Sequence, residues 1–217
     1  MEKIVLLALI LGGFVYWYRR QTRSSRLAYL DGYRFHPALR KKLLSRYPHL
    51  TDAQLDMVFN ALRDYFRFCL QAGNTMVSMP SQVVDAAWHE FILFTRSYKE
   101  FCTRALGRFL HHTPTEAMKT PTLAQDGIKR AWRLSCAQEQ IDPSSPDRLP
   151  VLFAIDTLLS IDDGFHYVLD CTNPASPAYG NGYCASHIGC SSGCAGDCGT
   201  GSDSCSDSGC GGGCGGD

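Results

Sequence analysis

Asp85 and His89 are the residues whose types and spacing most clearly suggest chemistry. They stand four residues apart within 82–106, a stretch whose apolar spacing predicts one helix, so both side chains share a face. A carboxylate beside an imidazole can orient a metal-binding histidine, ligate a metal itself, or hold His89 as a general base. The pattern leaves these three roles open.

Two more imidazoles, His111 and His112, follow Gly107, which is expected to end that helix. The connecting segment can fold back, so that Asp85, His89 and one of this pair form a two-histidine, one-carboxylate set. Zn and Fe(II) both use such ligands. These residues are therefore a candidate metal site with Zn or Fe as its cofactor. A structural hydrogen-bond network is the interpretation that we favour, and no catalytic residue is assigned.

Seven cysteines between residues 180 and 217 form a second group with possible chemistry, within the Gly/Ser/Cys-rich segment 171–217. They include no Cys-x-x-Cys pair, so a defined structural zinc site is not expected. Scarcity of apolar residues predicts a disordered tail. Collection of soft metals and redox sensing are the alternatives for these thiols. The seven are Cys184, Cys190, Cys194, Cys198, Cys205, Cys210 and Cys214.

The elements that must position the histidines lie between residues 27 and 170, where the apolar spacing is helical almost everywhere. Thr51 with Gln54 forms a capping box, and Ser81 is an expected N-cap for the helix of Asp85. Helices are also expected from Pro37, Pro121 and Pro150. The predicted fold is a mainly α, compact helical domain.

Three other residues of the 82–106 helix are expected to face the core. Trp88 lies about 100° around the helix from His89, and Tyr98 and Cys102 stand one turn apart on the apolar face. We interpret Tyr98 and Cys102 as packing residues rather than as a nucleophile and its partner.

A single N-terminal membrane-anchor helix is expected over residues 4–18, which are 15 residues without a charge. Four arginines follow the run, so the positive-inside rule places the N-terminus outside and the domain in the cytosol. They are Arg19, Arg20, Arg23 and Arg26. A cleaved signal peptide and a buried core helix are the alternatives. In a reducing cytosol the cysteines are expected to be free or metal-bound rather than disulfide-linked.

Charge is unevenly distributed along the chain. Residues 1–148 hold all 21 Lys and Arg against 13 acids, whereas residues 149–217 hold 8 Asp and no basic residue. The positive charge is spread over helix faces and the tail would repel phosphate, so no nucleic-acid partner is expected. No phosphate loop or dinucleotide fingerprint appears, so the common cofactor enzymes have no support.

One stretch resembles a known family. Pro80-Ser81, Val84-Asp85, Trp88-His89, Tyr98, Phe101-Cys102, Gly107 and His111-His112 are similar to the core motif of the glycine-rich domain-containing proteins, which are known from plants and have shorter bacterial relatives. Many plant members carry a second histidine at the position of Phe91. The resemblance implies no established activity. It implies that the motif residues form a shared site or a shared core, and that this chain is a bacterial member.

The sequence thus predicts an anchor with a basic flank over 1–26, a helical domain over 27–170 and a disordered tail over 171–217. The expected location is single-pass in a bacterial inner membrane. The leading hypothesis is a binding or scaffold module at the cytoplasmic face, held by residues 4–18 and recognising a protein partner. The alternatives are a metal-dependent site, and metal handling or redox sensing by the tail.

Overall fold

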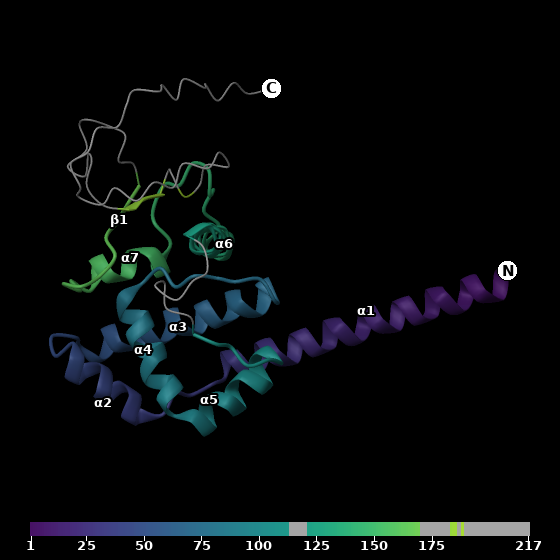
Figure 1. The fold of residues 1–217 in the computed structure, drawn as a ribbon, viewed down its shortest axis with the longest axis horizontal. Coiled ribbons are helices and arrows are strands. Elements are labelled where there is room, and N and C mark those ends of the chain that lie inside the picture. Colours follow the sequence, from purple (N-terminus) through teal and green to yellow (C-terminus); the bar gives the residue numbers. More distant parts are fainter. Residues whose placement is uncertain (113–120, 170–182, 186–187, 189–217) are drawn as a thin grey trace, which may run out of the picture.

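The computed structural model describes residues 1–112, 121–169, 183–185 and 188. The described chain is mainly helical, which confirms the expected fold class (Figure 1). Its elements are α1 (Glu2–Asp31), α2 (Pro37–Arg46), α3 (Asp52–Ala72), α4 (Gln82–Leu93), α5 (Thr95–Phe101), the π-helical turn η1 (Cys102–Leu106), α6 (Pro121–Glu139), α7 (Val151–Leu158), β1 (Tyr167–Val168) and β2 (Tyr183–Cys184).

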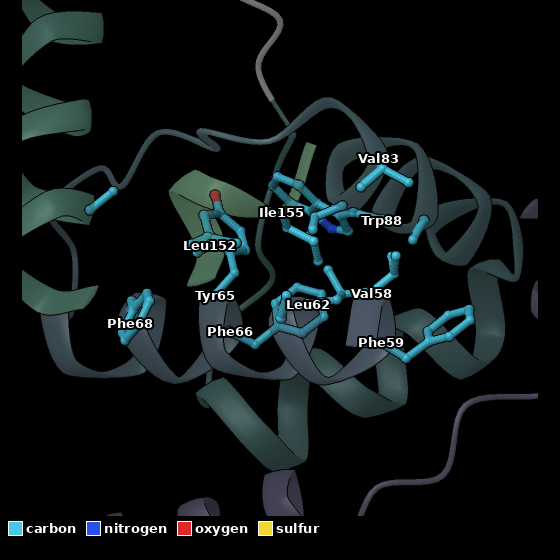
Figure 2. Close-up of a cluster of buried hydrophobic side chains, with 14 of the residues drawn as sticks. Val58, Phe59, Leu62, Tyr65, Phe66, Phe68, Val83, Trp88, Leu152 and Ile155 are labelled. Atoms are coloured by element: carbon cyan, nitrogen blue, oxygen red, sulfur yellow. The ribbon is translucent and has the colours of Figure 1, made fainter. Parts of the chain in front are cut away.

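Helix α3 is the centre of the domain, in contact with α1, α4, α6, α7 and η1. It begins with the predicted capping box, in which the Thr51 side chain accepts from the Gln54 backbone and the Gln54 side chain accepts from the Thr51 backbone. Its apolar residues recur at helical spacing and are buried against side chains of α4 and α7 (Figure 2). The labelled members of this core are Val58, Phe59, Leu62, Tyr65, Phe66, Phe68, Val83, Trp88, Leu152 and Ile155.

The prediction of one continuous helix over 82–106 is wrong. Phe94 leaves the helical conformation (φ −82°, ψ 59°), which separates α4 from α5, and the last turn before Gly107 is π-helical. In a straight helix Phe91 and Tyr98 would lie about 10 Å apart along the axis. The break brings their ring centroids to 5.3 Å in edge-to-face contact, and both side chains are buried. Core packing therefore bends this segment.

Helix α1 is longer than the expected anchor, and its C-terminal part belongs to the domain. Leu30 is fully buried in the core, and Arg26, expected to flank a membrane, instead donates to the Leu106 carbonyl oxygen over 3.3 Å. Figure 1 shows the N-terminal half projecting away from the other helices. Side chains on all sides of residues 4–18 are exposed there.

The expected single-pass membrane span is not supported by the structure. Among the described residues, no helix combines enough length with enough apolar character to cross a bilayer. The uncharged run of 15 residues is about 22 Å long as a helix, against a hydrocarbon layer of about 30 Å.

A two-residue parallel pair was not expected from the sequence. Tyr167 of β1 pairs with Tyr183 of β2, and Val168 pairs with Cys184. This pair places Tyr183 and Cys184 of the predicted tail beside β1, which contacts α7. Most of the predicted tail, residues 171–182, 186–187 and 189–217, lies outside the described residues, as does the side chain of Leu123.

Candidate metal centre

Helix α4 presents Asp85 and His89 side by side, as their four-residue spacing predicts. The His89 Nδ1 atom lies 3.0 Å from the Asp85 Oδ2 atom. The Asp85 side chain is 21% exposed and the His89 side chain 49% exposed, so this edge of α4 is open to solvent. Trp88, the neighbour of His89, points the other way into the core.

His112 completes the group from a segment that follows η1. Its Nε2 atom lies 3.0 Å from the Asp85 Oδ1 atom, so each carboxylate oxygen faces a different imidazole. The His89 and His112 ring centroids are 4.1 Å apart, and the His112 ring meets the Trp88 ring edge to face at 4.6 Å. One ligand atom from each of Asp85, His89 and His112 lies within 4.8 Å of the other two.

His111 does not join this group, although the sequence offered it equally with His112. Its side chain is exposed and its ring packs against Phe109, with the centroids 4.8 Å apart. Adjacent residues in an extended segment point to opposite sides. The path of the chain after Gly107 therefore selects His112 and turns His111 away.

The donor set of Asp85, His89 and His112 fits a divalent transition metal. Two imidazole nitrogens and one carboxylate oxygen are ligands that Zn and Fe(II) both accept. The two imidazole nitrogens that face the Asp85 oxygens are the atoms that would ligate a metal, once they carry no proton. Three protein ligands leave a coordination position for water, and the half-exposed His89 gives solvent access to it.

The sequence analysis missed Asp156, which fixes the start of α4. This carboxylate on α7 is 1% exposed and accepts from the Ser81 hydroxyl at 2.7 Å and from the backbone N–H groups of Gln82 at 2.7 Å and Val83 at 3.1 Å. Phe165 donates a further backbone hydrogen bond at 2.9 Å. Asp156 thus neutralises free N–H groups of α4 from another helix. A lone acid in the apolar run of residues 151–159 was the available signal.

The other motif residues, Trp88, Tyr98 and Cys102, are buried. Burial raises the pKa of the Cys102 thiol. A thiol that resists ionisation is a poor nucleophile. Cys69, Cys102 and Cys136 are buried free thiols.

Among the tail cysteines the structure describes Cys184 alone, and it is not part of this group. Cys184 is disulfide-bonded, which differs from the expected free or metal-bound thiol. Pairing of β2 with β1 holds this residue at 6% exposure, inside the domain rather than in the tail. Cys171 and the other six tail cysteines, together with the proposals of metal handling and redox sensing made for them, lie outside the described residues.

Comparison with known proteins places the chain in a family. The family model described as UCP032817-like matches residues 25–188, and the chain belongs to this family. The matched range includes the whole metal centre and Asp156. No curated protein matches the sequence and no solved structure matches the chain.

Proposed function

We propose that this protein is a metal-binding domain that holds one Zn or Fe(II) ion through Asp85, His89 and His112. The observation that carries the proposal is the convergence of the three side chains. Two come from one helix turn and the third from a separate segment, yet one ligand atom of each lies within 4.8 Å of the others.

The degree of burial also supports binding. His112 is 15% exposed and Asp85 21% exposed, so both are held by their surroundings, while His89 is 49% exposed. Ordered ligands lose little conformational freedom on binding, and one open side admits the ion and a water molecule. A metal-bound water has a lowered pKa and is a nucleophile at neutral pH, which is the chemistry such a centre would supply.

The test is the metal content of the full-length chain, measured by elemental analysis after equilibration with Zn or with Fe(II) under reducing conditions. We expect the unchanged protein to hold about one equivalent more than a variant that lacks a ligand, because the described residues contain one three-ligand group. The tail thiols can also bind these metals, so the comparison of variants decides the result.

His112→Ala and Asp85→Ala should each lose that equivalent. His111→Ala is the matched control, since it removes a neighbouring imidazole that points away from the centre. Equal metal content in His111→Ala and His112→Ala would contradict the proposal, because the metal would then be bound elsewhere.

The kinship with the glycine-rich domain-containing proteins is also a proposal of ours. It is supported by the placement of the shared motif. Asp85 and His89 belong to the candidate metal group, and Trp88 and Tyr98 are buried in the hydrophobic core. If the kinship holds, the metal centre is the shared site that the motif marks.

A second candidate function is attachment to an anionic membrane surface through residues 4–18. Large apolar side chains of this stretch are between 40% and 74% exposed. Single exposed apolar residues are common on protein surfaces, but a contiguous apolar patch of this kind marks an interaction site. The exposed Arg19, Arg20 and Arg23 follow directly and would attract anionic headgroups. Attachment here means insertion into one leaflet, not a span.

Vesicle flotation tests this attachment. We expect the full-length protein to float with phosphatidylglycerol vesicles and much less with phosphatidylcholine vesicles. Leu7→Glu should abolish flotation, because Leu7 is 68% exposed on the projecting helix. Leu158→Glu is the control, since Leu158 is 60% exposed but lies on α7. An equal loss of flotation in both variants would contradict the proposed attachment. So would a partner protein that covers residues 4–18 in the absence of lipid.

A further inference from the structure

A buried chain of hydrogen bonds runs from α4 to the segment that carries His112. The Trp88 indole N–H donates to the Tyr98 hydroxyl oxygen over 3.1 Å. The Tyr98 hydroxyl then donates to the Leu110 carbonyl oxygen over 2.5 Å. Trp88, Tyr98 and Leu110 are all buried, at 4%, 1% and 8% exposure. A carbonyl buried to this degree needs a donor, and Tyr98 provides it.

The same short segment is held at one further point. The His112 ring packs on the Trp88 ring, two residues further along. Burial raises the pKa of Tyr98, so its hydroxyl keeps its proton and remains a donor at neutral pH. These contacts fix the backbone on which His112 stands.

We infer that Tyr98 is a positioning residue for the metal centre: its hydroxyl anchors Leu110 and thereby sets His112 against Asp85 and His89. The inference rests on the proposed function and adds a residue that does not touch the ion. His112 is the ligand that most needs such help. Asp85 and His89 are aligned by their own helix turn, whereas His112 is 27 residues away from Asp85 in the sequence.

The critical variant is Tyr98→Phe in the full-length chain, because it removes one oxygen and retains the ring contacts with Phe91 and Phe109. We expect Zn affinity to fall about 10- to 100-fold, as for loss of other residues that orient a metal ligand. Tyr65→Phe is the matched control. Tyr65 is also buried, and its hydroxyl donates to a carbonyl oxygen, that of Val77, which lies in no ligand-bearing segment.

Two measurements separate positioning from a general loss of stability. The first is the absorption spectrum of the Co(II)-loaded protein, which should change in Tyr98→Phe because the His112 nitrogen leaves its place, and should not change in Tyr65→Phe. The second is a double-variant cycle. In the His112→Ala background, Tyr98→Phe should have no further effect on metal affinity, because its action passes through His112.

The outcomes distinguish this inference from the proposed function. If the unchanged chain binds neither Zn nor Co(II), both proposals fail. If it binds and Tyr98→Phe binds equally well, only the positioning role fails. Should Tyr98→Phe not fold, Trp88→Phe removes the indole N–H that orients the Tyr98 hydroxyl. It is expected to weaken Zn binding by several-fold, and an unchanged affinity in that variant would overturn the inference.

Discussion

The His112 Nε2 atom lies 3.0 Å from the Asp85 Oδ1 atom, although 27 residues separate the two in the chain. This contact closes the bend between α4 and the segment after η1. It also turns a helical Asp-x-x-x-His pair into a three-residue group. The contact has consequences for stability as well as for metal binding.

Added Zn should raise the midpoint of thermal unfolding of the full-length chain. An ion that binds only the native state at about 100 times its dissociation constant adds about 2.7 kcal/mol of stability. The measurement is differential scanning calorimetry with and without Zn, in the unchanged protein and in His89→Ala. We expect the increase to disappear in His89→Ala. The same increase in both proteins would mean that the stabilising ion binds outside this centre.

Asp156→Ala should lower the free energy of unfolding by about 3 kcal/mol or more, since hydrogen bonds to a charged group contribute about 1.5–3 kcal/mol each. The variant leaves the Ser81 hydroxyl and the first N–H groups of α4 without their buried acceptor. Urea denaturation followed by circular dichroism gives the value. Asp162→Ala, at an exposed turn position, serves as the control and should change stability by less than about 0.5 kcal/mol. Similar losses in the two variants would refute the capping role.

Stability should fall as the pH rises above about 9. Burial raises the pKa of Cys69 from 9.0 to about 12, and that of Tyr47 from 10.0 to about 12. The unfolded chain therefore loses these protons first, and between the unfolded and the folded pKa the native state is progressively penalised. The measurement is the urea midpoint at pH 8, 9 and 10. Cys69→Ala should reduce the slope between pH 8 and 10, and a midpoint that is flat over this range would contradict the assignment.

Gly127→Ala should be destabilising despite its position in helix α6, where alanine normally favours the helix. A Cβ at Gly127 would lie 2.1 Å from the Ser78 Oγ atom and 3.0 Å from the Ser78 backbone nitrogen. Overpacking of this kind costs about 1–3 kcal/mol. Gly12→Ala is the control, because a Cβ there meets nothing within 4 Å.

The same glycine allows a test by double substitution. Adding Ser78→Ala removes the closest clash and should restore part of the lost stability of Gly127→Ala. The backbone contact remains, so the rescue should be incomplete. A fully additive pair of substitutions would show that the two residues do not touch.

The sequence by itself determined which segments are helical and where several of them begin. Capping residues act on their own backbone within three or four positions, so Thr51 with Gln54 and Ser81 were readable without any tertiary information. The pairing of Asp85 with His89 was likewise a matter of helix geometry. All of these relations are local.

Tertiary structure decided the rest because it depends on contacts between distant segments. The break at Phe94 follows from packing Phe91 against Tyr98, and the choice of His112 over His111 follows from the way the chain leaves η1. Asp156 is meaningful only because α7 lies against the start of α4. The periodicity of apolar residues does not indicate such contacts. The sequence therefore predicted four candidate ligands, and the folded structure shows that three of them lie together.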